Sequence, residues 1–215
     1  QPFGRVLDLN QDQENFNINQ DRKVKTDKVE GKLDYYFILS PKSNFNLTLG
    51  VTDVRQDFDS SIFQILDNKT TQKFNDYNLV NRVNFKFQDA YAALHYRFIE
   101  GIFTFDPGVT LHYYKTTTDQ VSGIISDSYS FFRPDLRILM KLKESETLRL
   151  IFRSTRQFTD INNLAEGFIF RNYNSFFRGN PNLEAAFFNV VNLNYQSINI
   201  FNFTNIFANL SYSIR

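Results

Sequence analysis

Polar and apolar residues alternate along several stretches of the chain, as in a β-strand whose two faces meet different surroundings. Residues 44–52, NFNLTLGVT, place phenylalanine, leucine and valine on one face and asparagine, threonine and glycine on the other. Similar alternation predicts strands over residues 32–39, 77–98, 102–114, 131–142, 147–158, 185–195 and 200–214. No stretch has the period of an amphipathic helix. We therefore expect an all-β protein with about eight strands, or about nine if the weakly patterned residues 1–26 add one.

Short turns and long polar segments alternate between these strands. Compact turns are expected at residues 40–43, 99–101 and 143–146. Long outer loops are expected at about 53–76, 115–129 and 159–184. Strands of about 10–14 residues with this asymmetry are typical of antiparallel transmembrane β-barrels, whereas soluble sandwiches use strands of about 5–6 residues. The pattern favours the membrane barrel, with a soluble lipid-binding β-barrel as an alternative.

The stretch 77–98 changes phase along its length. Val83, Phe85 and Phe87 occupy odd positions, whereas the apolar residues of 90–98 occupy even positions. A one-residue slip exchanges the two faces of a strand, so we predict a β-bulge near Gln88–Ala90. A tight turn at Gln88–Asp89 would also explain the change.

Composition narrows the class of protein without identifying it. The chain has 25 Phe and 11 Tyr but no Trp, and its net charge of +1 gives no basic field for nucleic acid. Cysteine is absent, which excludes disulfides and thiolate metal sites. No run approaches the ~20 apolar residues of a membrane-spanning helix, and the first residues lack a signal-peptide pattern. A barrel hides its hydrophobicity in alternate residues, so these totals are compatible with it.

Residues for catalysis are scarce. His95 and His112 lie on successive strands, and the turn at 99–101 pairs them with residues near 106 and 89, so they should not meet. The sequence has no nucleophile elbow, phosphate loop or zinc-protease motif. We expect a protein that is not an enzyme, with no cofactor and no metal site.

The hairpin 131–158 has one apolar face and one strongly basic face. Its even positions are apolar and should contact lipid. Its odd positions form a candidate charge cluster facing the lumen: Arg133, Arg137, Lys141, Arg149 and Arg153. The turn at 143–146 predicts Arg137 opposite Arg153 and Lys141 opposite Arg149, and like charges in such pairs repel. Either a water-filled lumen solvates them, or an acidic partner, a plug surface or an anionic solute lies against this face.

The segment 159–184 is rich in aromatic and basic residues. Its candidate ligand-binding residues are Phe168, Arg171, Tyr173, Phe176, Phe177 and Arg178. Aromatic rings beside guanidinium groups suit stacking on sugars or aromatic ligands. The same rings could instead pack the loop onto itself or lie in the interfacial aromatic belt.

Several motifs, in order, resemble one known family. The stretch RGNPNLEAA (178–186) contains the turn Gly179, Asn180, Pro181, Asn182 and Leu183. DAYAALHYRF (89–98), FDPGVTLHYY (105–114) and SYSFFRPDLRILMKL (128–142) precede it. Together they resemble TonB-dependent receptors and related outer-membrane barrels, over roughly residues 77–195. The usual continuation in that family is Lys-Pro-Glu, whereas this chain has Glu184-Ala185-Ala186.

This resemblance implies a nutrient receptor in the outer membrane of Gram-negative bacteria. Such a barrel has about 22 strands, is filled by a plug domain, and is driven by a TonB-type energy complex to import a metal chelate, glycan or peptide. No plug, TonB box or terminal aromatic residue is visible here, so we expect residues 1–215 to be part of a larger barrel. A small outer-membrane barrel acting as an anchor or adhesin is the alternative. In the family turn, Gly179 is expected to supply conformational freedom and Pro181 a fixed bend.

Overall fold

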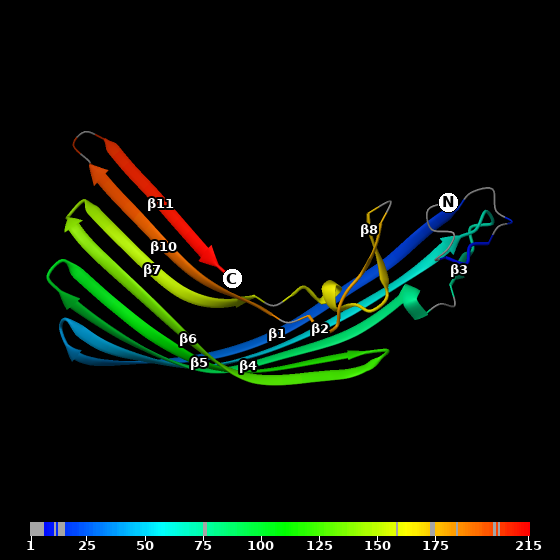
Figure 1. Ribbon diagram of the computed structural model, residues 1–215, viewed down its shortest axis with the longest axis horizontal. Helices are drawn as coiled ribbons and strands as arrows, with labels where there is room; N and C mark the ends of the chain where they lie inside the picture. Colours follow the sequence, from blue (N-terminus) through cyan, green and yellow to red (C-terminus); the bar gives the residue numbers. More distant parts are fainter. Residues whose placement is uncertain are drawn as a thin grey trace.

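A curved antiparallel sheet forms most of the molecule. The computed structural model describes residues 7–10, 12, 16–74, 77–157, 159–172, 175–183, 185–199, 201 and 203–215. The sheet has nine strands in the order β1-β2-β4-β5-β6-β7-β10-β11, with β3 paired to β2. Figure 1 shows these strands as a trough, a half-barrel with one concave and one convex face. The expectation of an all-β protein is confirmed, but the described part of the chain has eleven strands where eight or nine were expected, because β3 and the hairpin β8–β9 are short additional strands.

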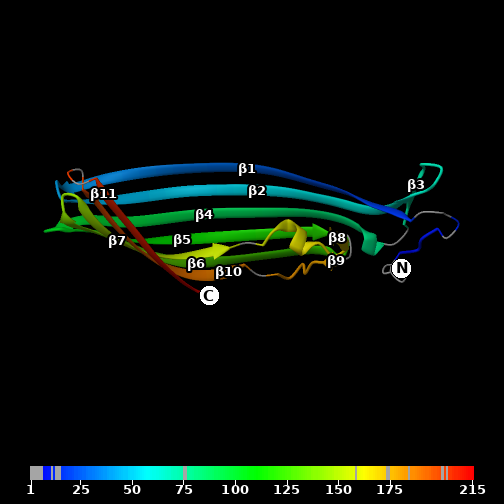
Figure 2. The same cartoon turned by 90° about the horizontal axis from the view of Figure 1, so that it is seen from above.

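The strands are long and lie beside their sequence neighbours, as Figure 2 shows from above. Their bounds are β1 Asn17–Ser40, β2 Ser43–Ile65, β3 Thr71–Lys73, β4 Val80–Glu100, β5 Phe103–Gln120, β6 Gly123–Lys143, β7 Glu146–Gln157, β10 Ala186–Asn199 and β11 Thr204–Ile214. A separate hairpin contains β8 Phe168–Asn172 and β9 Ser175–Arg178, and two short 3₁₀ helices, η1 Tyr77–Leu79 and η2 Ile161–Leu164, complete the fold. Among the described residues, no helix is long and apolar enough to cross a membrane.

The three compact turns between strands are confirmed, but two of the expected loops are largely strand. β2 continues through most of 53–76 to Ile65, and β5 and β6 continue through 115–129 to a tight turn at Val121–Ser122. The polar residues that suggested loops lie on strands that extend past the apolar region. Likewise, the second half of residues 1–26 belongs to β1 and forms no additional strand. The strands β1, β2, β4, β5 and β6, which have 18–24 residues, are therefore much longer than the ~9–11 residues that cross a bilayer.

β4 is regular where a β-bulge was predicted. It pairs with β2 without a break from Ser43↔Phe98 to Ser61↔Val80, and it pairs with β5 without a register shift. Both the bulge near Gln88–Ala90 and the alternative tight turn are therefore wrong. The phase change has another cause: the apolar residues move from one face of a continuous strand to the other.

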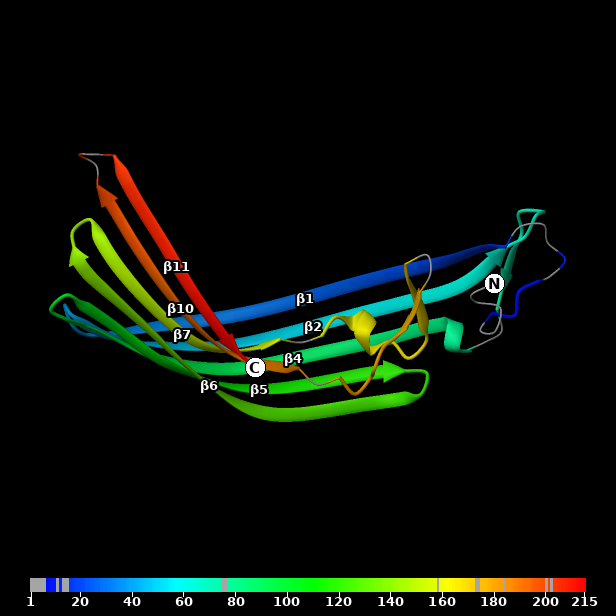
Figure 3. The ribbon, with the colours of Figure 1, turned by 45° about the horizontal axis from the view of Figure 1, so that its top comes forward.

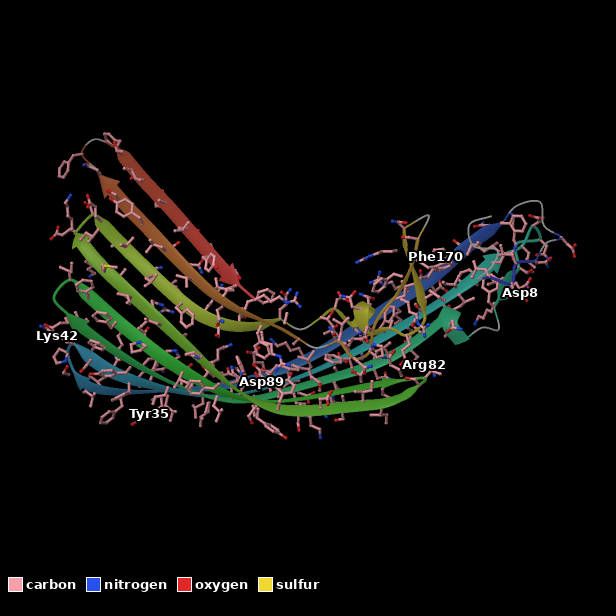
Figure 4. The ribbon with its side chains drawn as sticks, viewed as in Figure 1. Asp8, Tyr35, Lys42, Arg82, Asp89 and Phe170 are labelled. Atoms are coloured by element: carbon pink, nitrogen blue, oxygen red, sulfur yellow. The ribbon has the colours of Figure 1, made fainter. Side chains whose placement is uncertain are left out.

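This change of face divides the strands into two halves. In the membrane half, near the short turns, apolar side chains lie exposed on the convex face; Leu47, Leu49 and Val51 of β2 are 41%, 47% and 60% exposed. In the outer half, the apolar side chains lie on the concave face, where Phe58 of β2 and Val83 of β4 are 0% and 1% exposed. Figure 4 shows Tyr35, in the membrane half, pointing away from the convex face.

The segment between β7 and β10 folds onto the concave face of the outer half (Figure 3). Ile161, Ala165 and Ile169 pack against Phe58 and Val83 in one hydrophobic cluster. A second cluster, formed by Leu7, Leu9, Ile62, Phe74 and Leu79, contacts Phe168, Phe170 and Phe176 of the hairpin. We call residues 159–183 the inward loop. The two hydrophobic clusters explain why the apolar side chains of the outer half lie on the concave face.

Candidate functional site on the concave wall

The concave wall of the membrane half is polar, unlike the convex face. Thr48, Thr110 and His112 are buried on it, while neighbouring Leu47 and Leu111 are 41% and 55% exposed on the other side. Alternate residues of a strand point to opposite faces, so each strand presents apolar groups to lipid and polar groups to the lumen. This wall is the surface that a solute or an inserted domain would contact.

Two histidine–aspartate pairs lie on this wall. His95 Nε2 is 3.0 Å from Asp135 Oδ2, and His112 Nδ1 is 3.0 Å from Asp89 Oδ1. The two histidines belong to separate pairs, in keeping with the expectation that they do not meet. Their aspartate partners were not singled out from the sequence, although the hairpin register would place Asp89 diagonally across from His112.

A glycine makes room for one of these pairs. Gly108 lies opposite His95, and a Cβ atom at Gly108 would be 2.1 Å from His95 Cδ2. The imidazole ring therefore lies across the glycine and reaches Asp135 on β6. In the described part of the chain, no group of three or more His, Cys, Asp or Glu side chains could hold a metal ion.

Aromatic rings and one arginine form a row at the boundary between the two halves. The rings of His112 and Tyr114 stack at 5.0 Å, and Tyr114 lies 5.5 Å from Tyr129. The Arg156 guanidinium lies 3.8 Å above the Tyr129 ring and 4.6 Å from that of Phe187. Cation–π contacts of this kind are stabilising, more so where water is excluded. The row joins β5, β6, β7 and β10 where β7 turns into the inward loop.

The predicted charge cluster lies on the concave wall, but its pairing was predicted incorrectly. Arg153 is opposite Asp135, and Arg137 is opposite Ile151. Lys141 faces Thr147, and Arg149 faces Leu139. The register differs because the turn is tighter than expected and a shift occurs between Lys141 and Lys143. No two cations of the cluster are therefore directly opposite each other across β6 and β7.

The cluster still has more positive than negative charge. Arg137 Nη1 lies 3.5 Å from Asp106 Oδ2, a contact that leaves the arginine side chain 61% exposed. The other nearby acid, Asp135, is bonded to His95. Within the described residues, Arg133, Lys141, Arg149 and Arg153 form no ion pair. A surplus of cations therefore faces the lumen from β6 and β7.

Most of the loop residues predicted to bind ligand contact other parts of the protein. Phe176 lies 5.5 Å from Phe168 and 4.5 Å from Phe170, ring to ring. The Arg171 guanidinium lies 4.9 Å from the Phe177 ring, and Arg178 Nε donates a 2.6 Å hydrogen bond to the Glu166 carbonyl. These contacts match the alternative in which the rings pack the loop onto itself. Tyr173 lies outside the described residues.

The family turn, Gly179 to Leu183, closes the inward loop before β10. The Gly179 amide donates to the Ala165 carbonyl at 2.8 Å, and the Asn180 amide donates to the Asn163 carbonyl at 2.7 Å. A Cβ at Gly179 would be 2.4 Å from the Asn163 oxygen. Since the described glycines with positive φ are Gly101 and Gly123, Gly179 is required for close backbone approach and not for conformational freedom. The expectation about its role was wrong in this respect.

Comparison with solved structures identifies similar folds. The chain resembles the ferric citrate transporter FecA in its unliganded form, with a TM-score of 0.53 and 14% identity over 84% of this chain and 26% of that one. It also resembles the siderophore receptor PiuA from Acinetobacter baumannii, with a TM-score of 0.52 and 11% identity over 90% of this chain and 32% of that one. The chain therefore spans about a quarter to a third of the length of these proteins. At such identities the likeness establishes the fold alone.

Comparison of sequences identifies the family. A search of curated protein sequences finds no match. The family model described as "Outer membrane protein beta-barrel family" matches residues 5–215. The matched region includes all of the long antiparallel strands, which form the apolar convex face and the polar concave wall. The chain belongs to the outer membrane protein beta-barrel family, and its place is the bacterial outer membrane.

Proposed function

We propose that this chain forms part of the wall of a TonB-dependent-type transporter that takes up a scarce nutrient. The main observation is the polar, charged concave wall of a sheet whose opposite face is apolar. A wall of this kind suits a wide hydrated lumen, and it performs no covalent chemistry. The similar folds of a ferric citrate transporter and a siderophore receptor support the same class of function.

The open edges of the sheet favour a larger barrel over a small closed one. In the described part of the chain, β1 pairs only with β2, and β11 pairs only with β10. A strand edge inside a bilayer must be paired, because lipid offers no hydrogen bonds to its backbone groups. In our proposal further strands continue from β1 and β11 and complete a barrel of about 22 strands.

The cation surplus on β6 and β7 gives the wall a preferred partner. Arg133, Arg149 and Arg153 face the lumen without ion-pair partners among the described residues. Charged groups in a partly enclosed space attract surfaces of opposite charge. In our proposal an acidic surface of a plug domain lies against them, and a TonB-type complex acts on that plug.

The inward loop favours transport over adhesion. An adhesin would present its loops outward, whereas residues 159–183 pack through two hydrophobic clusters onto the concave wall. A segment placed there contacts whatever enters the lumen from outside. We therefore propose a role for it in selecting the solute.

Uptake in living cells tests the proposed function. The gene product containing this chain would be expressed in a host lacking its own receptors, and uptake of radiolabelled ferric citrate, peptides and oligosaccharides would be measured. We expect saturable uptake of at least one solute class that stops when a protonophore removes the proton gradient. Folded protein in the outer membrane without any energised uptake would contradict the proposal.

A further inference from the structure

A cavity lies between the inner wall and the end of the inward loop. It has a volume of about 270 Å³ and is bounded by the outer halves of β4, β5 and β6 on one side and by Pro181, Asn182, Leu183 and Ala185 on the other. We call it the turn cavity. None of the five described residues that were predicted to bind ligand lines it.

The volume sets the size of an occupant. A water molecule in the liquid takes up about 30 Å³, so the turn cavity could hold roughly nine waters. Covalently bonded atoms pack more densely than hydrogen-bonded waters, so a molecule of about a dozen heavy atoms also fits. This is the size of one sugar ring with its hydroxyl groups. A whole metal chelate or an oligopeptide would have to remain mostly outside.

The polar groups of the cavity are available to a ligand. Among the described residues, the side chains of Thr116, Thr118, Asp127 and Asn182 make no hydrogen bond with the protein. Two hydroxyls, a carboxylate and an amide thus point to one small space. Such groups can both donate to and accept from hydroxyl groups. Asp127 and Asn182 are also exposed, so a ligand can reach them from the lumen.

The charges of the cavity favour a neutral occupant. Among the described residues that line the cavity, Asp127 and Arg156 are the charged ones, one of each sign. The Arg156 guanidinium already lies between the rings of Tyr129 and Phe187. An anion would meet the Asp127 carboxylate, and a free cation would meet Arg156. A neutral molecule meets neither repulsion.

The remaining surface of the cavity is apolar. Phe85, Ile125, Leu164 and Leu183 line it together with Pro181 and Ala185. A ligand with many hydroxyl groups and also C–H surfaces would match both parts of the lining. Carbohydrate rings have this combination, whereas inorganic ions and simple amino acids do not.

We propose that the turn cavity binds one neutral sugar ring of a larger solute. As a statement about the solute, this inference rests on the proposed transport function and makes its substrate class a glycan or glycoside. The ring lies under the family turn, with Asp127 and Asn182 bonded to its hydroxyls and Leu164 and Leu183 against its C–H face. The rest of the solute extends into the lumen.

Direct binding to the purified full-length protein tests the inference. Methyl glucoside, methyl galactoside, methyl mannoside and N-acetylglucosamine would be titrated in detergent by calorimetry and saturation-transfer NMR, up to about 10 mM, with inorganic phosphate as the anionic probe. We expect saturable binding of at least one sugar and none of phosphate. Asp127→Ala should weaken sugar binding by about tenfold or more, because it removes hydrogen bonds to a charged acceptor. Thr118→Leu, which fills the cavity without removing a charge, should also weaken it.

Asp119→Ala is the matched control, since Asp119 lies on β5 but does not line the cavity. It should bind sugar as the unchanged protein does, and heat-dependent gel mobility would establish that every variant is folded. Absence of saturable sugar binding, equal binding by Asp127→Ala, or a preference for phosphate would overturn the inference. Uptake distinguishes the two proposals. Energised uptake of a solute without sugar binding refutes only the cavity assignment, whereas sugar binding without energised uptake refutes only transport.

Discussion

The two halves of the strands use the same backbone with opposite faces apolar. In the membrane half of β4, Leu94 is 46% exposed on the convex face, whereas in its outer half Val83 is 1% exposed on the concave face. Lipid surrounds the first region from outside, and the inward loop covers the second from inside. The apolar face of a strand therefore shows which side is shielded from water at that point along its length. The apolar face changes from convex to concave where the bilayer ends.

The largest expected effect is the removal of a buried ring from the outer half. Phe58→Ala would leave a cavity in the cluster that holds Ile161 and Ile169, at a cost of about 3–5 kcal/mol to docking of the inward loop. Trypsin should then cleave after Arg171 and Arg178 at least a hundredfold faster, since about 1.4 kcal/mol corresponds to a factor of ten. Phe37→Ala makes the same change on the convex face of the membrane half, where the ring is 53% exposed. If trypsin cleaved the inward loop at the same rate in the Phe58→Ala and Phe37→Ala proteins, the concave core would not hold the loop in place.

A charge placed on the convex face should locate the bilayer. Leu94→Arg would put a guanidinium against lipid near the middle of the membrane half, at a cost of about 2–4 kcal/mol. Asn84→Arg places the same charge on the same face of β4 in the outer half, where the change should stay within about 0.5 kcal/mol. Urea titrations of the full-length protein in phospholipid bilayers would measure both values. Equal costs would mean that lipid extends over the whole strand.

A methyl group at the family turn should loosen the inward loop without affecting the membrane half. Gly179→Ala brings its Cβ to 2.4 Å from the Asn163 oxygen, and overpacking of this kind costs about 1–3 kcal/mol. The amides of residues 179 and 180, bonded to the Ala165 and Asn163 carbonyls, should exchange hydrogen faster by mass spectrometry. Gly31→Ala is the control, because its Cβ would be an ordinary 3.7 Å from Val51 Cγ2. Unchanged exchange in Gly179→Ala would show that the close approach has no role.

The smallest effect on stability is expected in the charge cluster. The double variant Arg137→Gln with Arg153→Gln should change the free energy of unfolding by no more than about 0.5 kcal/mol, since these side chains have few partners to lose. The same variant should release the proposed plug more readily, as measured by protease protection of the plug in intact cells. Arg82→Gln, on the convex face of the outer half, supplies the control. Unchanged plug protection and solute uptake would refute an acidic partner on this wall.

The sequence predicted the faces of the strands better than their ends. Alternation at Leu47, Leu49 and Val51 was sufficient to assign the lipid side, because the bilayer imposes one rule along that length. Polar residues at positions 53–65 looked like a loop because the apolar residues between them pack against other segments of the chain. Phe58 packs with Ile161 and Ile169, about a hundred residues later, and Ile62 belongs to the second cluster, with Leu9 and Leu79. The phase change in β4 was attributed to a bulge for the same reason. The prediction assumed that the apolar residues of a strand stay on one face along its whole length.

Features that join distant segments were the least predictable. The pairing of Arg153 with Asp135 depends on a shift near Lys143 that no pattern indicates. His95 meets Asp135 only because β4, β5 and β6 are adjacent and Gly108 leaves space between them. The turn cavity needs the inward fold of residues 159–183, which alternation along single strands does not encode. The aromatic residues of the inward loop were correctly noticed, but sequence could not decide between ligand contact and self-packing.

The inward loop also determines which parts of this protein a phage or an antibody can reach. Barrels of this kind place their short turns on the periplasmic side and their long ends on the cell exterior. With residues 159–183 withdrawn onto the concave wall, Val121 at the tip of the β5–β6 hairpin is 68% exposed, whereas the adjacent Ser122 Oγ donates a hydrogen bond to the Glu166 carboxylate of the inward loop. Immune pressure should therefore act on exposed tip residues such as Val121, while the residues that hold the inward loop stay shielded from recognition.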